Sequence, residues 1–228
     1  MKVVIIGSGA YVTGRGGFGN GTILSSMYQY VKDGGIIDKI IITSPTSKSK
    51  LDVINAKENI ESRVGMQLPV DFLELESISS LKRCFSEECV DLCIISIPDH
   101  LHSMYIKACI ESGIAVLVVK PFTDNYEEAL SLTEDAEKGG IYCGVEFHKR
   151  LDESNLYLKR RIKEGGLGEL LYFVVNYSQR ISIPTNTFRS WSSKTNIFQY
   201  LGVHYVDLVY FLTGYMPTSL SVTSHMKR

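Results

Sequence analysis

Short runs of apolar residues alternate with longer amphipathic segments along the first two thirds of the chain. The run from Asp91 to Ile97 is typical, because its apolar side chains occupy consecutive positions rather than alternate ones. Strands of this kind lie in parallel sheets that helices cover on both faces. Six such runs predict strands near residues 2–7, 38–43, 70–75, 90–97, 114–119 and 141–146. With helical patterns between them, they predict an α/β domain with a doubly wound, mostly parallel sheet.

The pattern changes after about residue 150. A polar helical segment over 152–163 is followed by a β-rich run over 170–177, a helix over 198–212 and a strand-like run over 219–224. These elements predict a second domain that contains both helix and strand. Two strands and a helix leave unpaired strand edges, so we expect either a partner chain that covers them or a shortened protein.

Length and charge limit the kinds of molecule that this chain is expected to bind. A chain of 228 residues with 44% hydrophobic content can bury one sizeable core, or one domain and part of a second. Its 24 lysines and arginines nearly balance its 25 aspartates and glutamates, so no strong field attracts nucleic acid or an anionic membrane. We therefore expect a small-molecule ligand, with no nucleic acid and no membrane as partner.

Targeting and cysteine patterns predict a cytoplasmic protein. The first apolar run, Val3 to Ile6, is too short for a signal peptide or a membrane span. The five cysteines are an odd number without CxxC spacing and mostly lie inside apolar patterns. They are interpreted as buried thiols of a reducing compartment rather than as metal ligands or a redox pair.

A glycine-rich turn follows the first strand. Gly7-Ser8-Gly9 keeps two glycines of the dinucleotide-binding fingerprint, and Val12 stands where a third is usual. The first two allow a tight turn and a close approach of the backbone to a pyrophosphate. The loop continues to Gly21, and Arg15 can add a charge for phosphate; the alternative is a flexible loop without a ligand. The residues expected to bind a cofactor here are Gly7, Gly9, Ala10 and Tyr11.

The second strand ends without a carboxylate. NAD-specific sites carry an acidic residue there, which holds the ribose 2′-hydroxyl. Here Ser44 and then Lys48 follow the strand, and hydroxyl groups with a lysine suit a 2′-phosphate better. Both residues are predicted to bind the cofactor, with NADP slightly favoured over NAD; the alternative is a solvated lysine loop.

The carboxyl end of the fourth strand carries two histidines, His100 and His102. Pro98 ends the strand, and no Cys or Glu joins the histidines at metal-ligand spacing. A role at the start of a helix is therefore favoured over a metal pair, and no metal site is predicted. Ile97, Pro98 and His102 are expected to line the cofactor site.

The fifth strand breaks at Val119-Lys120-Pro121. Lys120 thereby places a cation where open α/β sheets bind ligands, and proline ends the strand. Lys120 and Pro121 are predicted to contact the cofactor, whereas the alternative is a surface lysine near a strand end.

Several short motifs follow one another over residues 97–214. They are Pro98-x-x-x-His102, the helix end at Ala108 to Gly113, Val119-Lys120-Pro121, the helix at Tyr126 to Ala129, Lys149-Arg150, the turn at Gly165 to Glu169, and Gly202-x-His204-x-x-Asp207. Each motif alone is weak, but their order and spacing together resemble the Gfo/Idh/MocA oxidoreductases. With the glycine turn, this resemblance covers nearly the whole chain.

The resemblance implies a Rossmann domain followed by an open antiparallel-sheet domain, which is incomplete in this chain. We expect the Rossmann core over residues 1–122, its closing helix and strand over 123–150, and part of a substrate-binding and oligomerisation domain over 151–228. The family's chemistry is hydride transfer between NAD(P) and a sugar, cyclitol or related polyol. A homo-oligomer is implied through the carboxyl-terminal sheet if that sheet is complete.

The same resemblance implies roles for single residues. Lys120 corresponds to the lysine of the family's Glu-Lys-Pro motif, and a desolvated amine can pass a hydroxyl proton while hydride goes to the cofactor. His204 corresponds to a histidine that faces the nicotinamide, although alone in an apolar helix it would be interpreted as a core residue. His148 falls where relatives place a polar substrate contact, Asp207 can orient His204, and Trp191 offers an aromatic face to a hydroxyl-rich ligand. These last three are the predicted substrate residues.

Three departures from the family pattern keep an alternative open. Val119 replaces the glutamate before Lys120, Tyr200 replaces an acidic residue one helical turn before His204, and about a domain's worth of sheet is missing. A phenol can donate and accept protons, so Tyr200 is predicted to assist catalysis. The alternative is a non-catalytic NAD(P)-binding sensor or regulator; a methyltransferase that uses the glycine loop is remote and would give Lys120 no role.

Overall fold

The computed structural model describes residues 1–15 and 19–224. These residues form two units: unit 1 is Met1–Glu146 with Arg180–Tyr200, and unit 2 is Phe147–Gln179 with the chain from Leu201 onward. Positions 16–18 of the predicted glycine loop and the last four positions of the predicted domain over 151–228 lie outside the described residues.

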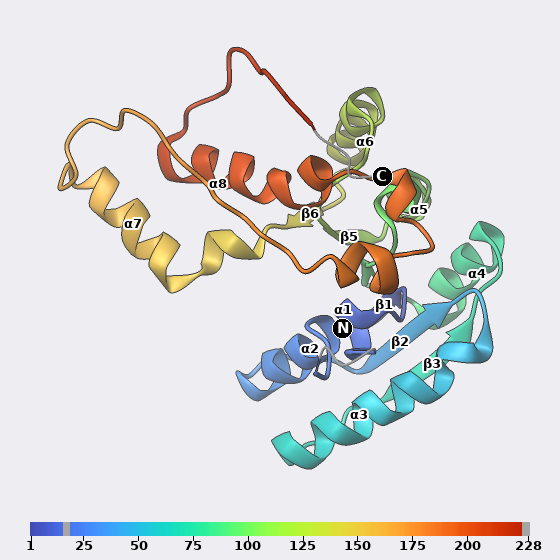
Figure 1. Cartoon of the computed structure of the whole chain (residues 1–228). Coiled ribbons are helices and arrows are strands. Elements are labelled where there is room, and N and C mark those ends of the chain that lie inside the picture. The colour runs from blue at the N-terminus through green and yellow to red at the C-terminus, as the bar shows by residue number, and fades with distance from the viewer. Residues whose placement is uncertain (16–18, 225–228) are drawn as a thin grey trace. The chain divides into compact units, whose positions relative to one another are not determined.

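Unit 1 is built on a six-stranded sheet in the order β3-β2-β1-β4-β5-β6 (Figure 1). Every neighbouring pair of strands is parallel, and each strand overlaps a predicted run, so the predicted parallel sheet is confirmed. The strands are β1 (Lys2–Ile6), β2 (Lys39–Ser44), β3 (Val70–Glu74), β4 (Leu92–Ile95), β5 (Ala115–Val119) and β6 (Cys143–Glu146).

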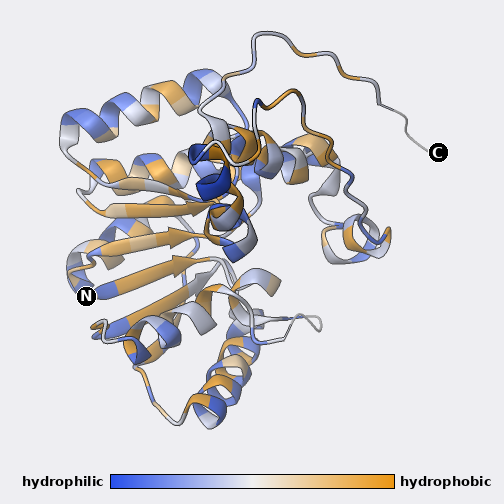
Figure 2. Cartoon of the chain, turned by 90° about the vertical axis from the view of Figure 1, so that its left-hand side faces the viewer, coloured by the Kyte–Doolittle hydropathy of each residue, from blue (hydrophilic) through white to orange (hydrophobic). Residues whose placement is uncertain are grey.

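Helices cover both faces of this sheet, which explains why the strands are apolar at consecutive positions. In β1, Val3 and Ile5 pack on one face with residues of α1 (Ala10–Thr13), α2 (Ile23–Lys32) and α3 (Lys50–Val64). Val4 and Ile6 pack on the other face with residues of α4 (Ile78–Glu88), α5 (His102–Glu111) and α6 (Tyr126–Gly139). Figure 2 shows the strands mainly in the hydrophobic colour and the helices in mixed colours, as expected for helices with one buried face.

The strand order reverses direction at β1, which lies between β2 and β4. At such a point the connections on the two sides diverge and leave a crevice outside the carboxyl ends of the strands. Gly7, directly after β1, has a φ of +107°, and a Cβ there would come within 2.1 Å of the Ser96 carbonyl oxygen. Glycine is therefore required where the first turn passes the end of β4.

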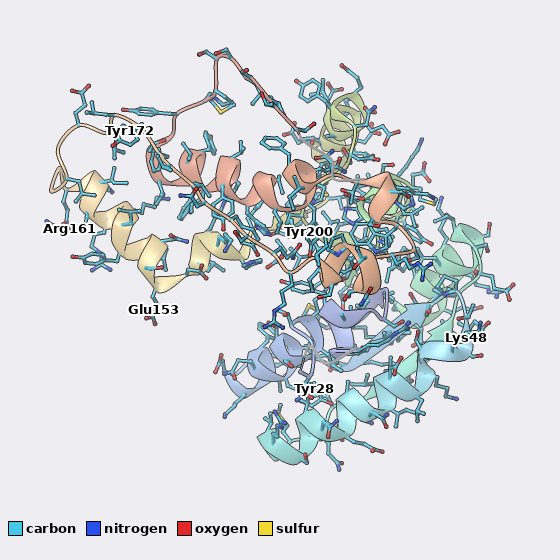
Figure 3. All side chains as sticks on the ribbon, viewed as in Figure 1. Tyr28, Lys48, Glu153, Arg161, Tyr172 and Tyr200 are labelled. Atoms are coloured by element: carbon cyan, nitrogen blue, oxygen red, sulfur yellow. The ribbon has the colours of Figure 1, made fainter. Side chains whose placement is uncertain are left out.

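Unit 2 contains α7 (Glu153–Lys163) and α8 (Val203–Thr213). The predicted strands over 170–177 and 219–224 are wrong, because neither run has regular secondary structure. Leu171 and Tyr172 are 81% and 78% exposed, and Tyr172 is labelled in Figure 3. A β-rich sequence becomes a strand only with a neighbour to pair with, and outside the six-stranded sheet no strand occurs among the described residues.

The segment that returns to unit 1, residues 180–200, holds two short turns of helix and part of a third. They are a π-helical turn at Ile183–Thr187, a 3₁₀ turn at Ser192–Lys194 and a π-helical turn at Phe198–Gly202. The predicted helix over 198–212 thus begins as a π-helical turn and becomes α-helical only at Val203. Within the described part of the chain, no helix is long and apolar enough to cross a membrane.

Candidate functional site

The glycine turn after β1 has the shape that a dinucleotide pyrophosphate needs. Gly9 is the N-cap of α1, and no heavy atom lies within 4 Å of the position its Cβ would occupy. Ala10 and Tyr11 form the start of α1. Gly7 holds the turn close to the sheet, and Gly9 leaves its surface open. The predicted cofactor residues therefore fit the pyrophosphate of NAD(P).

The end of β2 supplies the polar groups considered for a 2′-phosphate. Ser44 is the last residue of β2, and Lys48 is exposed in the 3₁₀ turn that follows (Figure 3). Arg15, proposed as an added charge, donates to Ser49 Oγ at 3.3 Å and lies 3.7 Å from an Asp52 carboxylate oxygen. A carboxylate, that of Asp52, therefore does lie near Arg15. It comes from α3 and not from the end of β2, where NAD-specific sites carry their acidic residue.

His102 connects the loops after β4 and β5. Its side chain is fully buried, with Nδ1 2.8 Å from the Pro121 carbonyl oxygen and Nε2 2.9 Å from the Ile97 carbonyl oxygen. Burial lowers the pKa of this imidazole, and a neutral ring carries only one N–H for the two carbonyls. Any influence of His102 on a cofactor therefore acts through the loops it holds, which agrees with the role predicted at the start of α5.

Lys120 lies at the carboxyl end of β5, partly buried. Its ammonium donates to the backbone carbonyl oxygen of Tyr200 and sits 4.0 Å from the centre of the Tyr200 ring. Burial lowers the pKa of Lys120 to about 8, while the charges of Glu146 and Asp99 oppose that shift. The side chain thus exchanges its proton nearer to neutrality than an ordinary lysine does.

Asp99 holds the returning segment against the end of β4. Its carboxylate accepts hydrogen bonds from Thr195 Oγ1 at 2.7 Å and Gln199 Nε2 at 2.8 Å, and from the backbone N–H of His100 at 2.9 Å. These bonds fix the π-helical turn from which Tyr200 reaches Lys120.

Trp191 belongs to an aromatic cluster in the same segment. Its ring lies 4.8 Å from that of Phe188 and 6.1 Å from that of Tyr200, between ring centres. The predicted substrate residue Trp191 and the predicted catalytic residue Tyr200 are therefore neighbours in unit 1 (Figure 3 labels Tyr200).

Unit 2 brings together the predicted residues His148 and His204. The buried ring of His204 lies 4.7 Å from the exposed ring of His148, edge to face, and 6.5 Å from Phe147. Because Tyr200 lies in a π-helical turn and His204 in α8, the α-helical spacing assumed for the pair does not apply.

Asp207 is engaged by Arg150. Arg150 Nε donates to Asp207 Oδ2 at 2.8 Å and Nη2 donates to Oδ1, which makes a two-point ion pair. This bond raises the pKa of the guanidinium. The ion pair occupies the carboxylate that was expected to orient His204.

Two acidic residues of the site, Asp99 and Glu146, were not among the predicted site residues. Glu146 is the last residue of β6, and Asp99 begins the 3₁₀ turn that comes four residues after β4, at the same edge of the sheet as Lys120. Their position near the carboxyl ends of predicted strands is the signal by which the sequence could have identified them as site residues. Tyr11 donates from its hydroxyl to Glu146 Oε1 at 3.2 Å, and burial together with Glu146 raises the pKa of the phenol.

Family models match both parts of the chain. Residues 1–147 match the model described as "Oxidoreductase family, NAD-binding Rossmann fold". Residues 155–228 match the model of the GFO/IDH/MocA C-terminal domain.

The curated relatives include two cyclitol dehydrogenases of Bacillus subtilis. The NADP(+)-dependent scyllo-inositol 2-dehydrogenase is 28% identical over 159 residues, which cover 69% of this chain and 44% of that protein. The NAD(+)-dependent scyllo-inositol 2-dehydrogenase is 30% identical over 132 residues, 58% of this chain and 38% of that protein. The chain therefore spans about half the length of these relatives, or less.

A solved structure shares the fold. Myo-inositol 2-dehydrogenase from Lactobacillus plantarum superposes with a TM-score of 0.64 at 18% identity, over 94% of this chain and 56% of that chain.

Proposed function

Since this chain belongs to the Gfo/Idh/MocA family of oxidoreductases, we propose that it is an NAD(P)-dependent dehydrogenase or reductase. Its proposed substrate is the CH–OH group of a sugar, cyclitol or related polyol, or the corresponding carbonyl compound. The observation that carries this proposal is Lys120: a partly buried amine with a pKa lowered to about 8 at the carboxyl edge of the sheet, in the same unit as the glycine turn. The two cyclitol dehydrogenases among the relatives support the substrate class.

The cofactor is proposed to lie along the carboxyl edge of unit 1. Gly7, Gly9, Ala10 and Tyr11 would hold its pyrophosphate, and Ser44 with Lys48 would face the adenosine ribose. Ile97, Pro98, Lys120 and Pro121 would line the nicotinamide half, with His102 fixing their loops. When bound, the nicotinamide ring accepts or returns a hydride. NADP is favoured over NAD because Lys48 offers a cation to a 2′-phosphate, and both cofactor types occur in the names of relatives.

Lys120 is proposed to handle the hydroxyl proton. In the oxidation direction the neutral amine takes the proton from the substrate O–H as the C–H hydride leaves, and in the reduction direction the ammonium returns it. A pKa near 8 suits both directions, because each protonation state is well populated near that pH. Tyr200, whose carbonyl oxygen accepts from Lys120, would orient the amine.

The remaining roles also stay proposals. His204 is the second proposed acid–base group, and His148, Asp207 and Trp191 are proposed substrate contacts, with Asp207 acting together with its partner Arg150. Residues 1–122 are proposed as the Rossmann core, 123–150 as its closing elements, and 151–228 as part of a substrate-binding domain. A homo-oligomer is proposed through that carboxyl-terminal part.

The test is turnover by the 228-residue chain with a panel of sugars, inositols and linear polyols, followed at the nicotinamide absorbance band. Titration with NADPH and NADH, read by nicotinamide fluorescence, measures binding separately. In Lys120→Ala we expect kcat to fall by about 10²- to 10⁴-fold, the range for loss of a general acid–base group, while cofactor binding is retained. Lys32→Ala, an exposed lysine on α2, is the matched control. Unchanged turnover in Lys120→Ala would contradict the mechanism.

A second candidate function is an NAD(P)-binding sensor that turns over no substrate. One observation favours it: the ammonium of Lys120 is already held by the Tyr200 carbonyl and ring. Cofactor binding by the wild type without turnover of any substrate in the panel would support the sensor and overturn the enzyme.

A further inference from the structure

Glu146 ends β6 directly beside the strand that carries Lys120. In the parallel pairing of β5 with β6, Val119 and Glu146 are partners in register. Partners in register point their side chains to the same face of a sheet. A carboxylate at position 146 therefore emerges next to the side chain of position 119, one residue before Lys120.

The carboxylate of Glu146 joins parts of the site that are distant in sequence. It accepts a hydrogen bond from Tyr11 of the glycine turn at 3.2 Å, and its charge acts on Lys120 as the larger of two carboxylate effects. Tyr11 and Val119 both pack with the apolar cluster on the α1 to α3 face, which agrees with Glu146 pointing to that face. One side chain of β6 thus contacts the glycine turn and influences the charge at the end of β5.

A partly buried ammonium needs a nearby negative charge, because burial otherwise favours the neutral amine. The groups that face Lys120 are the carbonyl and ring of Tyr200 and the carboxylates of Glu146 and Asp99. Asp99 also accepts hydrogen bonds from Thr195, Gln199 and His100. Of the two carboxylates, Glu146 has the larger effect on Lys120, and it also contacts Tyr11 of the glycine turn.

We propose that Glu146 is a positioning residue that sets the proton affinity of Lys120 and links it to Tyr11 of the glycine turn. It supplies from β6 the negative charge that Val119 does not supply from β5. This inference rests on the proposed function for its meaning in catalysis, but the charge coupling itself can be measured without turnover.

The experiment measures the pKa of Lys120 directly, by competitive acylation with isotopically labelled acetic anhydride at a series of pH values and mass spectrometry of the Lys120 peptide. In Glu146→Gln, which keeps the shape of the side chain, we expect the pKa of Lys120 to fall by about one unit, the lower end of the effect of an opposite charge within about 4–6 Å. The matched control is Glu74→Gln, because Glu74 ends β3 at the same edge of the sheet and is exposed. Circular dichroism checks that each variant folds.

A double variant that moves the carboxylate from β6 to β5 tests whether the negative charge itself sets the proton affinity of Lys120. The double variant Val119→Glu with Glu146→Gln returns a carboxylate to the same face in register, so we expect it to recover at least half of the lost proton affinity of Lys120. Should the double variant not fold, Glu146→Asp, which keeps the charge, is expected to stay closer to the wild type than Glu146→Gln.

The outcomes separate this inference from the proposed function. A lowered pKa in Glu146→Gln with no turnover in any assay supports the coupling and contradicts the enzyme. An unchanged pKa in a folded Glu146→Gln overturns the inference, even if the wild type turns over polyols. If turnover exists, the pH inflection of kcat/KM is expected to move down in Glu146→Gln and not in Glu74→Gln.

Discussion

Burial lowers the pKa of Lys120, the proposed proton-handling residue of the candidate site. If it takes the hydroxyl proton, it must be neutral in the oxidation direction, and its neutral fraction grows as pH rises through its pKa of about 8. We expect kcat/KM for polyol oxidation to fall about tenfold per pH unit below that value and to level off above it. Carbonyl reduction needs the ammonium, so its kcat/KM is expected to hold below about pH 8 and to decline above it. Stopped assays between pH 5.5 and 10 measure both profiles.

Lys120→Arg is the control for this profile, because a guanidinium stays protonated throughout the range. It is expected to lose the oxidation activity without any inflection near pH 8. An inflection near 6.5 that survives in Lys120→Arg would assign the titration to a histidine instead.

The sequence located Lys120 correctly at a strand end, because an apolar run followed by lysine and proline is a local pattern. Its electrostatic surroundings were not predictable in the same way. The groups that act on it come from positions 99, 146 and 200, and only the assembled sheet and the returning segment bring them to one place. Val119 was interpreted as the loss of a carboxylate, whereas the register of β5 and β6 places Glu146 beside it.

The returning segment is held to the rest of unit 1 by hydrogen bonds to the Asp99 carboxylate and by the bond from Lys120 to the Tyr200 carbonyl. Trp191, the one tryptophan of the chain, lies in this segment against Phe188 and Tyr200. In Asp99→Asn, we expect Trp191 emission to shift to longer wavelength and acrylamide quenching to increase, because a neutral amide replaces the acceptor of Thr195 and Gln199. The free energy of unfolding is expected to fall by about 2 kcal/mol, as for hydrogen bonds to a charged group.

Asp124→Asn is the matched control, since Asp124 is an exposed carboxylate in the loop after β5. Fluorescence and quenching equal to those of the wild type in Asp99→Asn would show that apolar packing alone holds the segment.

Strands and helices of unit 1 were predictable because their apolar periodicity is matched by burial on both faces of the sheet. The run over 170–177 has equal β propensity but no strand in the structure. Its side chains Leu171, Tyr172 and Val174 are strongly exposed, so propensity was present without the pairing that makes a strand. Likewise, no local pattern distinguishes the π-helical turn at Phe198–Gly202 from the first turn of α8.

The path of the whole chain leaves unit 1 after Glu146, returns at Arg180 and leaves again after Tyr200. A single cut in the exposed turn at residues 165–168 therefore yields two fragments that both contribute to unit 1. With a protease site inserted there, we expect the fragments to elute together in native size-exclusion chromatography and to separate in denaturant.

The hydrogen bonds of Asp99 and Lys120 to residues 195, 199 and 200 join the two fragments. The same cut in an Asp99→Ala background is expected to release them more readily. Separate elution of the fragments from the cut wild type, without denaturant, would contradict this account.

Because residues 180–200 return to unit 1, the codons for the candidate site lie in two separate stretches of the gene. A frameshift or stop codon anywhere between codons 147 and 179 leaves every codon of the six strands unchanged, yet it removes Tyr200 from Lys120 and both side-chain partners from Asp99. Such an allele would encode a protein that keeps the glycine turn, Lys120 and Glu146 but loses the contact of Tyr200 with that lysine. Allelic series of this gene are therefore expected to separate nucleotide binding from proton transfer.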